Sequence, residues 1–380
     1  MRVVVLGAGF GGLELSTRLS EELGDAADVL LIDRAPGFIF GFSKIDVMFG
    51  RTAPDAVFHP YADLVKPGVR FLQADITAID PVAKRVETDA GSFEADVLVV
   101  ALGADLHPEA TPGLLEGGHE FYTVEGAFAA RDVVASFGGG HVVVGVTSTP
   151  FKCPPAPSET ALLLDEVLRS RGLRDRSEIS LVMPLPVPIP PSLTASEALL
   201  AAFSERGIAW YPNRLIREID PARKAAVFQD GTELTYDLFL GVPPHRVPTA
   251  VAESGLCVDG WVPVNPLTLE TSFPRVFAVG DVTSAGTPKA GVFAERQATA
   301  VADRIVALVR GEAATAEHDG RGLCYVEVGN DEVARVNVQF VAGQPPVGTF
   351  DAASTEIAED KAEFGSSRVQ RWFGREWTTI

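Results

Sequence analysis

Residues 2–12 have the sequence RVVVLGAGFGG, and the fold of the chain follows from this segment. An apolar run, typical of a buried strand, leads directly into a glycine-rich turn. A helical spacing of leucines comes next, at Leu13, Leu15, Leu19 and Leu23. A pyrophosphate requires backbone N–H donors and the positive end of a helix, and only glycine lets the backbone come that close. We therefore assign Gly7, Gly9 and Gly12 to a dinucleotide-binding turn; the alternative is a glycine-rich turn in an unrelated α/β protein.

Two later strand ends support this interpretation. The apolar run Val29–Ile32 ends in Asp33, about 20 residues after the last glycine of the turn, where dinucleotide folds place a carboxylate on the ribose hydroxyls. A strand that begins at Val276 ends in Gly280-Asp281, and its carboxylate suits a hydroxyl-rich chain such as ribitol. The N-terminus of the helix expected at about 291–310 can support negative charge on a nearby ring.

Composition and charge exclude several classes of protein. The 380 residues suffice for two or three domains of roughly 150 residues each. The net charge of −19 disfavours nucleic-acid binding, because a polyanion would be repelled. No run reaches the ~20 apolar residues of a membrane span, and residues 2–6 leave no room for a signal peptide, so we expect a cytoplasmic protein. Three cysteines are too few for a disulfide scaffold and suggest no metal site. Cys257 has no polar residues framing it in the sequence, so we treat it as structural.

The chain contains an internal repeat at an offset of about 140 residues. Residues 68–99 and 207–240 share an extended run, a meander with its own turn and a buried strand. The chain therefore carries two related α/β units, and the second begins near Gly140 with a strand over 141–146.

The second unit lacks the features that bind a nucleotide. Its turn aligns Thr147 with Gly9 and Pro150 with Gly12, and proline has no N–H to donate to a phosphate. Its second strand, over 179–183, ends without an acidic residue for a ribose. We expect that this copy has lost its nucleotide site.

A proline-framed cysteine follows the altered turn. Residues 151–159 have the sequence FKCPPAPSE, with Cys153 between a lysine and two prolines. Lys152 and the N-terminus of the helix expected over 160–169 would both favour the thiolate, which is the reactive form. The alternative is an inert core cysteine, and Cys324, taken alone, is also more often a core residue.

Together these motifs resemble the FAD-dependent pyridine nucleotide-disulfide oxidoreductase superfamily, whose members contain two dinucleotide folds. Within it, the chain is similar to the branch of sulfide:quinone oxidoreductase and flavocytochrome c sulfide dehydrogenase. The likeness extends to about residue 338, and it is carried by residues 7–12, 33, 101–104, 151–159, 279–281, 288–291 and 324–325.

The resemblance implies an α/β fold with two Rossmann-like, FAD- and NAD(P)-binding domains of three-layer ββα architecture and a short α+β C-terminal region. Residues 1–105 and 246–315 would form the FAD-binding domain, 106–245 the second domain with a degraded nucleotide motif, and 316–380 the C-terminal region. FAD would be bound without a covalent link, because residues 120–123 contain no cysteine. The residues expected to bind it are Gly7, Gly9, Phe10, Gly11, Gly12, Asp33, Arg34, Ala101, Gly103, Gly280, Asp281 and Lys289.

The same resemblance implies the chemistry. Cys153 and Cys324 would form a redox disulfide that hydrosulfide attacks, after which two electrons pass to FAD and then to a quinone. Glu159 would act as acid or base, unless it is a helix-capping or solvated carboxylate. Lys289 would lie at the pyrimidine edge of the flavin or at the quinone carbonyl, unless it is a solvated loop lysine. The expected partners are sulfide and a quinone, and the oligomeric state stays open.

Three other functions stay open. The chain could be the flavoprotein subunit of a sulfide dehydrogenase with a cytochrome partner, an NAD(P)H-dependent quinone or disulfide reductase, or a non-catalytic redox-sensing flavoprotein. The missing export signal disfavours the first of these functions, and the degraded second turn disfavours the second.

The C-terminal segment bears on membrane contact. One helical face carries apolar residues with arginines beside it: Val369, Trp372, Phe373, Trp377 and Ile380, with Arg368, Arg371 and Arg375. An aromatic face flanked by arginines is typical of an interfacial helix, which predicts peripheral contact with the inner face of the cell membrane. The alternative is a terminal helix that docks on its own core or on a partner subunit.

Overall fold

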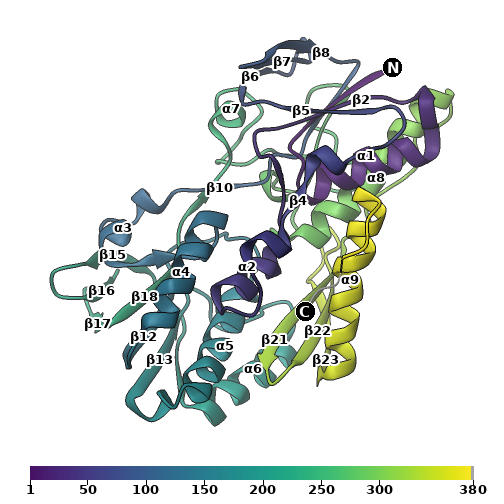
Figure 1. Cartoon of the computed structure of the whole chain (residues 1–380). Helices are drawn as coiled ribbons and strands as arrows, with labels where there is room; N and C mark the ends of the chain where they lie inside the picture. Colours follow the sequence, from purple (N-terminus) through teal and green to yellow (C-terminus); the bar gives the residue numbers. More distant parts are fainter. Residues whose placement is uncertain (378–380) are drawn as a thin grey trace.

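The first unit is built on a parallel sheet to which both halves of the chain contribute. The computed structural model describes residues 1–377. The strand order of this sheet is β20-β9-β1-β2-β5. Its strands β2 and β5 are labelled in Figure 1, near the N-terminus. The strands are β1 (Arg2–Leu6), β2 (Asp28–Asp33), β5 (Val69–Gln73), β9 (Val97–Val100) and β20 (Val276–Ala278). The sheet is thus complete only when the distant strand β20 pairs with β9.

Side-chain alternation gives this sheet two different faces. Val3 and Val5 pack against two helices, whereas Val4 and Leu6 pack against an antiparallel meander. Successive side chains of a strand point to opposite faces, so one apolar strand serves both layers. The covering elements are α1 (Phe10–Leu23), α8 (Gly291–Arg310), β6 (Ile76–Asp80), β7 (Arg85–Thr88) and β8 (Gly91–Glu94).

The second unit repeats this arrangement. Its parallel sheet has the order β11-β18-β12-β13-β14, with helices on one face and the meander β15-β16-β17 on the other. The predicted α/β fold class and the internal duplication are confirmed. The elements are β11 (His119–Glu120), α4 (Val124–Ser136), β12 (Gly140–Val146), α5 (Ala156–Ser170), β13 (Ser177–Val182), α6 (Leu193–Arg206), β14 (Ile208–Tyr211), β15 (Ile216–Asp220), β16 (Ala225–Phe228), β17 (Glu233–Thr235) and β18 (Leu238–Val242).

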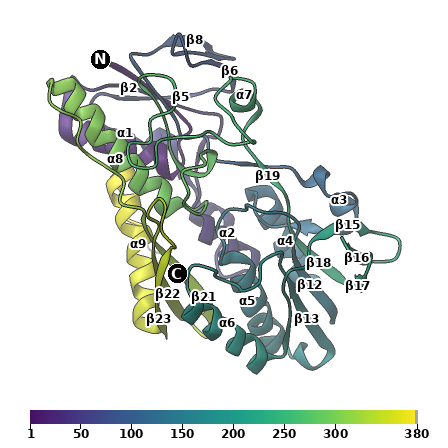
Figure 2. The ribbon, with the colours of Figure 1, turned by 180° about the vertical axis from the view of Figure 1, so that it is seen from behind.

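The C-terminal region contacts both units. It contains an antiparallel sheet, β21 (Arg321–Gly329), β22 (Glu332–Gln339) and β23 (Val347–Ser354), followed by helix α9 (Thr355–Phe373). Strand β21 packs against α5 and α8, and α9 runs along β22 towards α1 (Figure 2). This placement brings a late strand of the chain to the start of helix α5.

Short elements connect these parts. The pair β10-β19 is antiparallel and lies where the chain passes between the two units. Their bounds are β3 (Gly37–Phe38), α2 (Gly41–Met48), β4 (His59–Pro60), β10 (Asp105–Leu106), α3 (Leu114–Gly117), β19 (His245–Arg246) and α7 (Thr249–Ala252), with 3₁₀ turns at 24–26, 54–57, 61–63, 108–110, 174–176 and 280–282.

The aromatic face of α9 packs on the protein's own core. Val369, Trp372 and Phe373 are buried in the cluster that contains α1 and α8. Trp377 stacks on Phe40, with ring centroids 5.4 Å apart. Ile380, which we assigned to the same face, lies outside the described residues.

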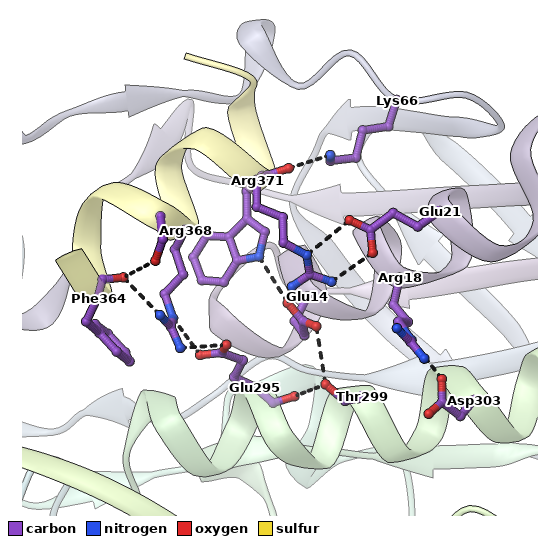
Figure 3. Close-up of polar contacts among 12 residues, drawn as sticks. Glu14, Arg18, Glu21, Lys66, Glu295, Thr299, Asp303, Phe364, Arg368 and Arg371 are labelled. Carbon is purple, nitrogen blue, oxygen red and sulfur yellow. Dashed lines mark hydrogen bonds and ion pairs between the residues drawn. The ribbon is translucent and has the colours of Figure 1, made fainter. Parts of the chain in front are cut away.

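The arginines beside that face are paired with carboxylates. Arg368 contacts Glu295 of α8 at 2.9 Å, and Arg371 contacts two glutamates of α1 (Figure 3). Arg375 pairs with Asp63 at 3.1 Å. The prediction of an interfacial helix is therefore wrong for this face, and docking on the protein's own core is confirmed. Within residues 1–377, no helix combines the length and the apolar character needed to cross a bilayer.

Candidate active site

One cavity collects most of the predicted site residues. Its volume is about 410 Å³, and it is bounded by the first unit, the loop before α5, and strand β21. The predicted residues that line it are Gly7, Gly9, Phe10, Gly11, Asp33, Ala101, Gly103, Cys153, Glu159, Gly280, Asp281 and Cys324. The side chains of Arg34 and Lys289 and the backbone of Gly12 do not line it.

The glycine turn has the geometry of a ligand cradle. Gly7 has a φ of +97°, and a Cβ there would lie 2.5 Å from the carbonyl oxygen of Ala101. A Cβ on Gly12 would lie 1.9 Å from the carbonyl oxygen of Gly7, so this glycine permits the close packing of α1 against the turn. A Cβ on Gly9 would meet no protein atom within 4 Å, because this residue faces open space at the N-terminus of α1. The helix end and its N–H groups are thus directed at the cavity.

Asp33 at the end of β2 braces this turn. Its Oδ2 accepts a hydrogen bond from the Ala8 N–H at 2.6 Å, and its Oδ1 accepts one from the Ala35 N–H at 2.8 Å. Burial raises the pKa of its carboxyl, and these two hydrogen bonds act in the opposite direction. The guanidinium of Arg34 lies 3.3 Å from Asp105, and Arg34 does not line the cavity, so its place among the cofactor-binding residues stays a prediction.

Asp281 presents a buried carboxylate oxygen to the same cavity. The neighbouring Gly280 has a φ of +77°, and its N–H donates to Gln297 Oε1 at 2.7 Å. Asp281 Oδ1 is buried and has no hydrogen-bond partner among the described residues. A buried acceptor of this kind requires a donor, and a hydroxyl-bearing ligand in the cavity would supply it.

The two cysteines reach the cavity from different parts of the chain. Cys153 lies in the loop between β12 and α5, is exposed to the cavity, and has a φ of +52°. A non-glycine residue in this region is strained, and such strain gathers at functional sites. Its N–H donates to the carbonyl of Lys289 at 2.7 Å, which anchors the loop. Cys324 lies on β21 and, like Cys153, is a free thiol in this structure.

The electrostatics of these thiols differ from the prediction. Burial raises the pKa of the Cys153 thiol well above its ordinary value, and the charge of Glu159 acts in the same direction. Burial likewise raises the pKa of Cys324 to about 12. Lys152 does not offset this effect, because its Nζ donates to the Ala104 carbonyl at 3.0 Å. The expectation that Lys152 and the helix end make Cys153 a thiolate is therefore wrong for the dithiol form.

Glu159 is neither solvated nor a cap of its own helix. It lies in the first turn of α5, which begins at Ala156 rather than at the predicted Thr160. Only 5% of its surface is exposed, and its Oε1 accepts a hydrogen bond from the Glu327 N–H of β21 at 3.0 Å. Burial raises the pKa of Glu159 to about 7. A carboxyl that titrates near neutral pH on the wall of a cavity can act as both acid and base.

Lys289 is buried and lines a second cavity rather than the first. Its Nζ donates to the carbonyls of Asp281 at 2.6 Å and Thr283 at 3.1 Å, and it lies 3.2 Å from the ring centroid of Trp261. Burial lowers its pKa to about 8. It lines a second, largely apolar cavity that Cys324 also borders. The solvated-lysine alternative is wrong, because Lys289 is buried, and its place at the flavin or at a quinone carbonyl stays a prediction.

Sequence reasoning missed other charged residues of the first cavity. Lys44 of α2 lines it, and its Nζ donates to the Tyr122 carbonyl. Burial lowers the pKa of Lys44 to about 8. A single lysine in the apolar helix 41–48 could have drawn attention. Lys361 of α9 also lines the cavity, but no sequence pattern connects it with residues so far away in the chain.

Two parallel-sheet units, a glycine turn and two cysteines on one cavity define a nucleotide-dependent oxidoreductase. The family described as pyridine nucleotide-disulphide oxidoreductase matches residues 1–298, so the chain belongs to that family. It is an FAD-dependent oxidoreductase.

Within this family, the chain is similar to proteins named sulfide:quinone oxidoreductase. The mitochondrial sulfide:quinone oxidoreductase of Mus musculus is 26% identical over 376 residues, covering 93% of this chain and 82% of that protein. The sulfide-quinone reductase of Aquifex aeolicus is 28% identical over 355 residues, covering 87% and 81%. The crystal structure of the Aquifex aeolicus sulfide:quinone oxidoreductase superposes with a TM-score of 0.87 at 24% identity, over 98% of this chain and 91% of the other, and shows the same fold.

The residues of the cavity fit FAD. The N-terminus of α1 and the open face of Gly9 suit its pyrophosphate. Asp33 stands at the strand end where a ribose is bound in dinucleotide folds. The unpartnered Oδ1 of Asp281 suits a hydroxyl donor of the ribityl chain.

Proposed function

We propose that the protein is a sulfide:quinone oxidoreductase, which oxidises sulfide at Cys153 and Cys324 and passes two electrons to a quinone. One observation carries the proposal: the two cysteines, from distant parts of the chain, line the cavity that the glycine turn and Asp281 also line. The matched relatives are named for this activity. When bound, FAD supplies a two-electron acceptor that a quinone can reoxidise.

The chain's own residues provide the sulfur chemistry. In the oxidised protein Cys153 and Cys324 would be joined, and hydrosulfide would attack one sulfur, forming a persulfide there and releasing the other as a thiolate. Glu159, which titrates near neutral pH, would take up or return the proton that sulfide carries. The positive φ of Cys153 indicates that the surrounding structure holds this loop in a strained conformation, which supports a role for the loop in this exchange.

The loop 147–155 argues against NAD(P)H as the electron donor. In the first unit only residues 7–9 separate β1 from α1, so a helix end reaches the cavity. In the second unit α5 begins only at Ala156, and Thr147 Oγ1 donates to the Val242 carbonyl instead of leaving room for a phosphate.

Cofactor attachment and location complete the proposal. Phe121 and Tyr122 line the cavity where a third cysteine would be needed for a covalent link, so we expect FAD to be released on denaturation. Because quinones dissolve in membrane lipid, we propose that the protein works at the inner face of the cell membrane. The buried face of α9 is not the contact surface.

Anaerobic bleaching of the bound flavin tests the function. Sulfide should bleach it rapidly, a short-chain quinone should restore the colour, and NADH should do little. Bleaching by NADH but not by sulfide would contradict the proposal. Reoxidation by a cytochrome and not by a quinone would favour a sulfide dehydrogenase subunit, and the absence of turnover with any acceptor would favour a redox sensor.

A further inference from the structure

A cluster of charged residues surrounds Glu159 and has no role in the proposed sulfur chemistry. It consists of Asp46 on α2, Arg51 just after α2, Glu327 on β21 and Lys361 on α9. Glu159, Glu327 and Lys361 are each less than 9% exposed. Burying several charges is costly unless they are paired, so such a cluster needs an explanation beyond chance.

Glu327 connects the members of the cluster. Its N–H donates to Glu159 Oε1 at 3.0 Å, while its carboxylate accepts from Lys361 Nζ and from Arg51 Nη1. Arg51 also lies 3.3 Å from Asp46 Oδ1. The backbone N–H of Glu327 therefore holds the Glu159 carboxyl in place, and the Glu327 carboxylate holds Lys361 and Arg51.

Lys361 and Asp46 act on Glu159 with opposite signs. Lys361 lines the same cavity wall as Glu159, and its ammonium favours the carboxylate form. The carboxylate of Asp46 favours the protonated form, and Arg51 acts with Lys361. In a partly buried site each such charge is worth more than in water, because the effective dielectric constant is lower.

We propose that Lys361 and Asp46 are positioning residues that set the protonation of Glu159 in opposite directions. Helix α9, at the end of the chain, thereby takes part in proton handling at the cavity. The use of that proton rests on the proposed function, whereas the electrostatic coupling does not. The titratable and charged groups facing Glu159 from the surrounding elements are Asp46, Arg51, Tyr122, Cys153, Cys324, Glu327 and Lys361. Glu166, on the same helix as Glu159, lies 3.7 Å from Arg51.

Infrared titration of the FAD-loaded protein measures the protonation of Glu159 directly. Its carboxylic acid band is the one that disappears in Glu159→Gln. We expect Lys361→Met to raise the midpoint of this band by about one pH unit, because a cation is lost, and Asp46→Asn to lower it by a smaller amount. Lys361→Arg keeps the charge and should restore the midpoint towards that of the unchanged protein.

Arg368→Met is the matched control. It removes a cation and an ion pair from the same helix, but Arg368 pairs with Glu295 and does not act on Glu159. It should leave the midpoint unchanged. If Lys361→Met proves too unstable, Asp46→Asn still decides the question, since a merely structural role predicts no downward shift.

Midpoints that stay fixed in both variants, or move in the same direction, would overturn the inference. Bleaching by sulfide is measured on the same samples. If sulfide fails to bleach the unchanged protein, the proposed function fails, while opposite shifts of the midpoint would still support the coupling.

Discussion

The connections β1–α1 and β12–α5 occupy the same place in two related units, yet they offer different chemistry. Residues 7–9 join the first strand to its helix and place the N-terminus of α1 at the cavity. Residues 147–155 join the second pair and present the thiol of Cys153. Both strands lie at the centre of their parallel sheets. The comparison shows that the sheet supplies the position and that the connection determines what is bound or reacts there.

The two connections also differ in what holds them in shape. The first depends on the absence of side chains, since Cβ atoms at Gly7 and Gly12 would collide with backbone. The second depends on prolines and on the hydrogen bond from the Cys153 N–H to the Lys289 carbonyl. Substitutions in the first connection should therefore impair cofactor binding, and substitutions in the second should impair the reaction with sulfide.

Gly12→Ala is expected to have the largest effect, because its Cβ would lie 1.9 Å from the Gly7 carbonyl oxygen and force α1 away from the turn. We expect loss of bound FAD, measured by flavin absorbance of the purified protein. Gly138→Ala, before the central strand of the second unit, meets no atom within 4 Å and should keep a full complement of FAD. A full complement of FAD in both variants would show that the glycine turn is not needed for cofactor binding.

Cys153→Ser in the second connection and Cys324→Ser on β21 should each abolish the sulfur chemistry and leave the glycine turn of the first connection intact. We expect the rate of flavin reduction by sulfide to fall about a thousandfold or more, because nucleophilic exchange needs both sulfurs. FAD content should not change. Cys257→Ser, which alters a cysteine outside both connections, serves as the control and should react as the unchanged protein does. Full activity in either active-site variant would exclude the disulfide mechanism.

Glu159→Gln should lower the rate of reduction by sulfide about a hundredfold. Because burial raises the pKa of Glu159 to about 7, its carboxylate form grows as pH rises through 7. The advantage of the unchanged protein over Glu159→Gln should therefore increase between pH 6 and pH 8. Taking the ratio of the two rates at each pH cancels the ionisation of sulfide itself. A ratio independent of pH would show that Glu159 is not the base.

Lys152→Met should have the smallest effect, since its ammonium is bonded to the Ala104 carbonyl. We expect the rate at which iodoacetamide alkylates Cys153 in the reduced protein to change by less than about threefold. Lys44→Met should slow alkylation more, because the charge of Lys44 lowers the pKa of Cys153. A tenfold lower alkylation rate in Lys152→Met would show that Lys152 does activate the Cys153 thiol.

Local signals predicted the fold well. The glycine turn, the end of β2 at Asp33 and the bounds of α8 at 291–310 all depend on residues that are neighbours in the sequence. The sequence predicts the start of α5 at Thr160, after a loop that contains three prolines. Proline is tolerated in the first turn, where its missing N–H has no partner to lose, so the helix starts at Ala156.

Side-chain direction and distant contacts could not be predicted. The aromatic pattern around Trp372 fits a membrane surface and a protein core equally well, and only the packing of α9 on α1 distinguishes them. Lys152 precedes Cys153 in the sequence, but its Nζ donates to the Ala104 carbonyl, whereas Lys361 reaches the cavity from the far end of the chain. Charges that act on a cavity are set by tertiary structure, which sequence spacing does not report.

Strand β20 is synthesised long after the four strands with which it forms the first sheet. The strands of the second sheet are contiguous in the sequence, from β11 to β18, so all of them are available once residue 242 has left the ribosome. The sheet that holds the cofactor waits for β20 and its helical cover waits for α8. The nascent first segment therefore spends much of translation without its partner strand, and we expect FAD to bind only after α8 has been synthesised.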